Sequence, residues 1–253
     1  MIQDLHSHTY YSFCGKDSPE AIVEAAIAGG IELFGICDHN YGIGYGDRIP
    51  FRDPSVPNAY APGMLRNYFE HIDRIKAQYA DRIRILRGIE IATNQFADNK
   101  GGKVTLPENE DISYFDYCLI EHLDSPTSVT GGDLFSFAKR CGCGQVGIAH
   151  TDLFAFIESR GEDPLDYFRR MAENNIFWEL NVNYDSIHKY REHGYVKRFL
   201  EDEAQQRIVR ESGMGLSVGF DGHRVEDYLP ERLKQCCQRL EELELRLVFS
   251  DEA

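Results

Sequence analysis

The sequence predicts an α/β fold in which parallel strands form a closed or nearly closed barrel. Short and almost continuously apolar runs recur along the 253 residues, as is typical of strands that are buried on both faces. Helical stretches separate the runs, and repeated strand–helix units imply a parallel sheet with right-handed crossovers. An open doubly wound sheet fits the same pattern, but seven units in a chain of this length favour the barrel.

Seven apolar runs have the length of a strand, and an eighth run predicts either a further strand or a C-terminal cap. The eighth run is Leu245–Phe249. In chain order, the seven predicted strands are Ile2–Leu5, Glu32–Cys37, Ile83–Ile91, Phe115–Ile120, Gln145–Ala149, Ile176–Val182 and Leu216–Phe220.

Recognisable end signals mark the helices between the strands. Ser18 can cap the first helix, Pro19 suits its first turn, and Gly29 or Gly30 can end it. The segment Tyr41–Pro62 is rich in Gly, Pro, Tyr and Asp and lacks periodicity, which indicates a long active-site loop. The other predicted helices are Gly63–Tyr79, Gly132–Cys141, Pro164–Asn174, Tyr195–Ser212 and Pro230–Leu243.

Charge and cysteine content restrict what the chain binds and where it works. The net charge of -15 would repel a polyanion, so we expect no stable nucleic-acid partner. A small phosphorylated substrate remains compatible, because bound cations can invert the local field. Seven cysteines without an export signal favour free thiols, and no apolar run approaches the ~20 residues that span a bilayer. We therefore expect one cytoplasmic domain over residues 1–253 with no membrane segment; the pattern does not indicate an oligomeric state.

Metal-ligating residue types gather where the predicted strands end. Six of the nine histidines lie just beyond a predicted strand, and none lies inside one. Because the carboxyl ends of parallel barrel strands open onto one face, we expect these side chains to converge. The His-x-His and Asp-x-His pairs should each point to one side, since side chains on extended backbone alternate. The set is His6, His8, His39, Glu90, His122, His150, Asp221 and His223.

Six imidazoles and two carboxylates are too many donors for one tetrahedral zinc ion. We therefore expect two or three divalent ions (zinc, manganese or iron), bridged by a carboxylate such as Glu90. A single His-x-His pair would be weak evidence, because a structural hydrogen bond explains it about as often. The joint pattern is more specific. The remaining histidines fall in a predicted helix or a polar connection, and we expect a surface position for His71, His188 and His193.

These residues resemble the signature of the PHP (polymerase and histidinol phosphatase) family. The likeness runs from Asp4-Leu5-His6-Ser7-His8-Thr9 to Phe220-Asp221-Gly222-His223-Arg224, with the motifs in the family's order. The resemblance implies a distorted TIM-like (β/α)7 barrel, in agreement with the number of predicted strands. It also implies a phosphoesterase that binds up to three divalent metals.

The resemblance further implies a set of ligands. Family members complete the third site with a histidine or aspartate where this chain has Cys14. Either the thiolate binds metal here, which would favour zinc or iron over manganese, or Cys14 only packs and the third site is weakened. Carried over, the set is a first ion on His6, His8 and Asp221, a second on His122 and His150, and a third on His39 and His223, with Glu90 bridging the first two.

We interpret the chain as a phosphomonoesterase acting on a small phosphorylated metabolite, with a metal-activated hydroxide as nucleophile. The last motif and the segment Glu179-Leu180-Asn181 resemble stand-alone histidinol phosphate phosphatases, but their Cys-x-His first motif is not matched. The substrate is therefore open. Carboxylates that could relay a proton or orient a ligand imidazole are Asp38, Asp124 and Asp152. Cations that could grip phosphate are Arg224, Arg160 and Lys16.

Three alternatives fit parts of the pattern. A phosphodiesterase or nucleotidase on short or cyclic nucleotides could stack a base on aromatic residues of Tyr41–Pro62. A metal-dependent amide hydrolase commonly carries a carbamylated lysine where this chain presents Glu90, which argues against it. A metal-binding regulatory module would keep the ligands without catalysis.

Overall fold

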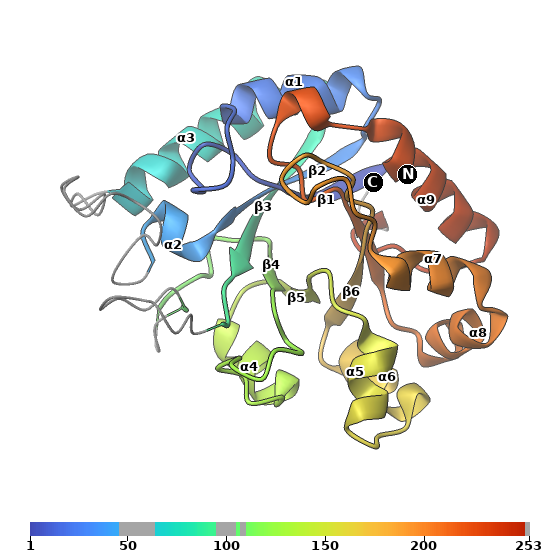
Figure 1. The fold of residues 1–253 in the computed structure, drawn as a ribbon. Coiled ribbons are helices and arrows are strands. Elements are labelled where there is room, and N and C mark those ends of the chain that lie inside the picture. Colours follow the sequence, from blue (N-terminus) through green and yellow to red (C-terminus); the bar gives the residue numbers. More distant parts are fainter. Residues whose placement is uncertain (46–63, 95–104, 107–109, 251–253) are drawn as a thin grey trace.

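Seven parallel strands form the centre of the molecule, with the helices arranged around them (Figure 1). A computed structural model describes residues 1–45, 64–94, 105–106 and 110–250, so most of the predicted loop Tyr41–Pro62 lies outside the described residues. Each strand pairs with the next in chain order, as a TIM-like (β/α)7 barrel requires. This confirms the predicted fold class. The strands are β1 (Gln3–Ser7), β2 (Leu33–His39), β3 (Arg84–Ile91), β4 (Tyr117–Ile120), β5 (Gln145–Ile148), β6 (Ile176–Asn181) and β7 (Leu216–Gly219).

The helices follow the predicted end signals in most places. The Ser18 hydroxyl caps the first helix by accepting from the N–H of Ala21 at 3.3 Å. The described helices are α1 (Pro19–Ala28), α2 (Asn40–Ile43), α3 (Met64–Gln78), α4 (Leu134–Cys141), α5 (Leu153–Ser159), α6 (Pro164–Glu173), α7 (Gly194–Glu201), α8 (Glu203–Ser212), the 3-10 helix η1 (Val225–Asp227) and α9 (Pro230–Glu242).

The prediction of one helix over Tyr195–Ser212 is wrong, and the short helices α2, α5 and η1 were not predicted. Asp202 adopts φ -99° and ψ 99°, which interrupts the helix, and its side chain then caps α8. An aspartate at the junction of two helical patterns is therefore a boundary signal. The unpredicted α5 begins in the same way, because the Asp152 side chain accepts from the N–H of Ala155 at 3.2 Å.

The barrel closes between β1 and β7 through hydrogen bonds to side chains as well as between main-chain groups. Ser7 and Gly222 form an isolated parallel bridge there. Next to it, the Asp4 carboxylate accepts from the N–H of Phe220 at 2.9 Å, and the Gln3 side chain accepts from the N–H of Val218 at 3.4 Å. Two polar side chains thus replace ladder bonds at the seam, which is where the barrel departs from a regular one.

A hydrophobic cluster that is separate from the larger main core fills the inside of the barrel and includes Leu5, Tyr117 and Phe177. The Tyr117 hydroxyl donates to the carbonyl of Leu5 at 2.5 Å across the interior. Gly35 makes room for it, since a Cβ there would lie 1.9 Å from the Tyr117 oxygen. The run Leu245–Phe249 is a cap and no eighth strand: it forms one bridge to the first residue of β7 and contributes to the interior cluster.

Two further features bear on the sequence-based expectations. All seven cysteines are free of disulfide bonds. Within the described ranges, no helix combines the length and the apolar character that crossing a bilayer would require.

Candidate metal centre

One buried carboxylate, Glu90, lies at the centre of the predicted ligand set. From β3, its Oε1 lies 3.1 Å from His150 Nε2. Its Oε2 lies 3.1 Å from His39 Nδ1 and 3.3 Å from His8 Nε2. A single carboxylate thus contacts imidazoles that follow or end three other strands. They meet at the carboxyl end of the barrel, which is where the active sites of such barrels lie.

His6 approaches the same carboxylate from β1, and its ring is held from behind. Its Nε2 lies 3.4 Å from Glu90 Oε1 and 3.6 Å from Asp221 Oδ1. Its Nδ1 lies 2.7 Å from Glu179 Oε1, a contact that fixes the ring orientation. Gly219 is required for this contact, because a Cβ at that position would lie 2.2 Å from Glu179 Oε1. The buried Nε2 has no hydrogen-bond partner, which is the state of a nitrogen poised to bind an ion.

Alternation along extended backbone explains only some of the side-chain directions at the centre, because several ligands do not lie on extended backbone. His6 lies inside β1 and His39 is the last residue of β2, so the prediction that no histidine lies inside a strand is wrong. Asp221 follows the end of β7 with φ 54°, which is left-handed rather than extended. His122 and His150 share this region, at φ 56° and 26°. Such strained backbone outside glycine often accompanies functional sites, and here it redirects side chains toward the centre.

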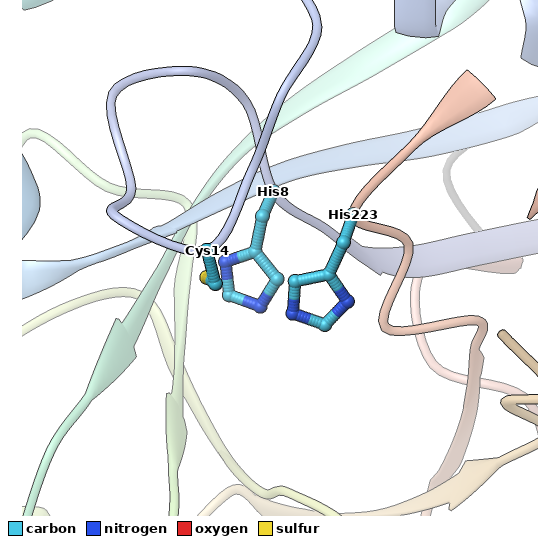
Figure 2. Close-up of side chains that lie close together, drawn as sticks. All are labelled: His8, Cys14 and His223. Atoms are coloured by element: carbon cyan, nitrogen blue, oxygen red, sulfur yellow. The ribbon is translucent and has the colours of Figure 1, made fainter. Parts of the chain in front are cut away.

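Three residues form a group with a sulfur donor, which we call the sulfur end: His8, Cys14 and His223 (Figure 2). One ligand atom of each lies within 4.8 Å of the others. Burial raises the pKa of the Cys14 thiol well above its usual value, and the nearby Asp221 and Glu90 raise it further. The thiol therefore stays protonated unless a cation is bound. His223 is oriented by Asp185, whose Oδ2 lies 3.0 Å from His223 Nδ1.

A second group contains two carboxylates, and we call it the oxygen end: His39, Glu90 and Glu121. Their ligand atoms also lie within 4.8 Å of one another. Glu121 Oε1 lies 3.7 Å from His39 Nδ1, and Glu121 Oε2 lies 3.1 Å from His122 Nε2. His39 Nδ1 is buried and has no hydrogen-bond partner. Glu121 was not among the residues identified from the sequence.

The electrostatics of the centre suit cations. Burial by itself would raise the pKa of Glu90, but His6 and His39 outweigh it and hold that pKa well below the usual range. The pKa of Asp221 is also held well below its usual range, because His6 and other imidazoles outweigh the effect of burial. Burial lowers the pKa of His150, yet Glu90 raises it to about 9. Anionic carboxylates facing unpartnered imidazole nitrogens are the donor set that divalent metal ions take, so the residues present fit such ions.

Two of the three carboxylates predicted to relay a proton or orient an imidazole, Asp38 and Asp152, are engaged elsewhere. Asp38 is fully buried and accepts from Thr9 and Ser12, for example from the Ser12 hydroxyl at 2.7 Å. Asp152 caps α5 and forms an ion pair with Arg198. In the described part of the chain, neither carboxylate bonds directly to a histidine of the centre. Asp38 acts through Ser12, whose oxygen lies 3.3 Å from His8 Nδ1, so its geometry matches an orienting role better than proton transfer.

The three predicted phosphate-binding cations differ in how they are engaged. Arg224 directly follows the last motif; it donates to Glu226 at 3.2 Å, while its buried Nε has no hydrogen-bond partner. Arg160 is held by Glu162, with its Nε 3.0 Å from the carboxylate. Lys16 is exposed, and its backbone N–H donates to the carbonyl of His223 at 3.0 Å.

The three remaining histidines, for which a surface position was expected, are partly buried. His71 is mostly buried between Tyr11 and Glu20, with contacts of 2.9 and 2.8 Å. His188 lies 3.6 Å from Asp221 Oδ2 at the edge of the centre, and the ring of His193 stacks on His150 at 5.9 Å. The signal that could have found the last two is their position after the end of β6, on the same rim.

The chain is similar to known proteins in sequence and in fold. The family model described as PHP domain matches residues 4–223. A curated histidinol-phosphatase of Lactococcus lactis subsp. lactis is 28% identical over 109 residues, which cover 38% of this chain and 34% of that protein. The aligned part therefore spans about a third of the relative's length.

The fold can also be compared with solved structures. One is a histidinol phosphate phosphatase from Lactococcus lactis subsp. lactis in complex with zinc, L-histidinol and phosphate. It superposes with a TM-score of 0.57 at 15% identity, over 97% of this chain and 95% of that one. At this identity the likeness is one of fold, and it supports the barrel described above.

Proposed function

The chain belongs to the PHP domain family, and from this premise we propose that it is a metal-dependent phosphomonoesterase acting on a small phosphorylated metabolite. The observation that carries the proposal is the placement of Glu90, whose two oxygens contact imidazoles from three other strands. Histidinol phosphate is the first substrate to test, because a curated relative and a solved structure of similar fold bear the name of that activity.

We assign the proposed ions to residues as the family resemblance implies. The buried, unpartnered nitrogens of His6 and His39 support this assignment. Bound divalent ions would lower the pKa of water and neutralise charge on the phosphate. The assignment is a first ion on His6, His8 and Asp221, a second on His122 and His150, and a third on Cys14, His39 and His223, with Glu90 shared.

Other residues of the chain would orient these ligands. The Glu179 carboxylate accepts from His6 Nδ1 and so directs Nε2 toward the centre. Asp185 does the same for His223. Arg224 is our preferred phosphate-binding residue, since it adjoins His223 and keeps an unpaired Nε. Arg160 and Lys16 remain further candidates, and Asp152 remains a candidate for proton transfer.

A nucleotide phosphodiesterase is the second candidate, and one observation favours it. Phe13 is 38% exposed and its ring stacks on His39 at 5.7 Å and on Tyr41 at 5.7 Å, so aromatic rings gather beside the centre. A base could stack there. Comparing the hydrolysis of p-nitrophenyl phosphate with that of its bis-ester separates the two candidates: faster cleavage of the bis-ester would overturn the monoesterase proposal.

The test of the proposed function removes ligands one at a time. We expect His6→Ala, His122→Ala and Asp221→Ala to abolish hydrolysis of histidinol phosphate and p-nitrophenyl phosphate after reconstitution with manganese, iron or zinc. Circular dichroism should show that each variant folds. Glu158→Ala, which removes an exposed carboxylate on α5, serves as the control and should keep wild-type turnover. Unchanged turnover in the folded ligand variants would contradict the proposal.

A further inference from the structure

Glu121 is a buried carboxylate that the family resemblance does not assign to any ion. It directly follows Ile120, the last residue of β4, and is only 6% exposed. Its backbone is fixed on both sides, because its N–H donates to the carbonyl of Ile91 at 3.2 Å and its carbonyl accepts from the Thr93 hydroxyl at 2.5 Å. His122, the next residue, adopts a left-handed φ of 56°, and its Nε2 lies 3.1 Å from Glu121 Oε2, so the two adjacent side chains lie together. The carboxylate therefore has a defined position.

The neighbours that compensate the charge of this carboxylate are histidines, and His122 is the nearer of the two. Its oxygens face His39 Nδ1 and His122 Nε2, and among the described residues no lysine or arginine forms an ion pair with it. Glu90 Oε2 approaches the same His39 nitrogen at 3.1 Å, so two carboxylates and one unpartnered nitrogen point into one small volume. Burying two anionic groups together is costly unless a cation lies between them.

We propose that Glu121 is a metal-binding residue whose carboxylate joins His39 and Glu90 around a divalent ion at the oxygen end. The proposal rests on the proposed function only in requiring that the centre binds ions. It assigns His39 to this ion with Glu90 and Glu121, in place of the ion shared with Cys14 and His223. Two carboxylate oxygens and one imidazole nitrogen form a hard donor set, which suits Mn²⁺ or Fe²⁺. The sulfur end, with its thiol and two imidazoles, is a softer set that suits Zn²⁺.

The experiment measures Mn²⁺ binding directly, without reference to turnover. Metal-free wild type, Glu121→Gln and Glu121→Asp are titrated with Mn²⁺, and free Mn²⁺ is followed by electron paramagnetic resonance. Gln keeps the volume of the side chain and removes the charge, whereas Asp keeps the charge on a shorter arm. Glu158→Gln is the matched control, because it removes the same charge from an exposed position on α5.

We expect wild type and Glu158→Gln to bind Mn²⁺ alike. Glu121→Gln should lose one tight equivalent, or bind it at least about tenfold more weakly, and Glu121→Asp should fall between them. Thermal unfolding of the metal-free proteins should show Glu121→Gln at least as stable as wild type, since one buried like charge is gone. Wild-type affinity in Glu121→Gln would overturn the proposal. Failure of the proposed function would instead appear as absent hydrolysis by a wild type that binds metal.

Discussion

The sulfur end and the oxygen end belong to one centre but offer different donors. His8 connects them, because its ring stacks on His223 at 4.7 Å and on His39 at 4.7 Å. On one side of it lies a thiol whose pKa is raised, and on the other lie two carboxylates, Glu90 and Glu121. Since donor hardness selects among divalent ions, this difference in donors supports the proposal that the two ends take different metals.

The largest effect should come from the carboxylate that contacts both ends. Glu90 Oε2 lies 3.3 Å from His8 Nε2 and 3.1 Å from His39 Nδ1. We expect Glu90→Gln to lower kcat by about 10³-fold or more, and to reduce metal content at both ends. Steady-state kinetics and elemental analysis per chain measure this. A variant that loses only one ion would contradict this prediction, because Glu90 would then bind metal at the oxygen end alone.

The next largest effect should come from Glu179, which contacts His6 Nδ1 and belongs to neither end. Glu179→Gln weakens the hold on His6 Nδ1, so overall metal affinity should fall by about 10–100-fold. The preference between zinc and manganese should not change, because no donor atom at either end is altered. Competition titrations with a chelator give both values. A changed preference would show that His6 contributes to one end more than the other.

A smaller and more selective effect is expected at the sulfur end. Cys14→Ser replaces a soft donor with a hard one, so zinc should bind about tenfold more weakly, a loss of about 1.4 kcal/mol of binding free energy. Manganese binding should stay as in the wild type. Calorimetric titration with each metal tests this, and Cys14→His, which restores a family donor, should recover zinc affinity. Equal losses for both metals would contradict the distinction between the ends.

The smallest effect should follow from a residue that contacts both ends without binding metal. The Ser12 hydroxyl accepts from the N–H of His39 at 2.9 Å and donates to Asp38 at 2.7 Å. We expect Ser12→Ala to lower the free energy of unfolding by about 1–3 kcal/mol, as for a buried hydrogen bond to a charged group. Denaturant titration measures this. Metal preference should be unchanged, and a shift toward either metal would mean that Ser12 orients one end specifically.

The sequence was informative about the barrel because burial on both faces leaves a direct trace. Runs such as Ile176–Val182 are mostly apolar over a strand's length, and most of the ligands lie at the rim where such runs end. The helix boundary at Asp202 was harder to predict, because a cap inside a continuous apolar period depends on local φ and ψ. The segment Leu245–Phe249 shows the same limit: its apolar pattern suits a strand or a cap, and packing decides.

The centre could be predicted only where ligands follow extended backbone or family motifs. Glu121 escaped notice because alternation places neighbouring side chains on opposite sides, whereas the left-handed His122 brings both to one side. Such a conformation outside glycine cannot be inferred from residue type. Asp185 and His188 lie in a polar connection without periodicity, so their contact at 2.9 Å depends on the tertiary fold.

Anomalous X-ray diffraction tests the two-ended centre most directly. Crystals of metal-free wild type would be soaked with equal amounts of Zn²⁺ and Mn²⁺, and data collected at the absorption edge of each metal. The account predicts a zinc signal beside Cys14 and a manganese signal beside Glu121. The same metal at both ends, or no signal at either, would contradict it.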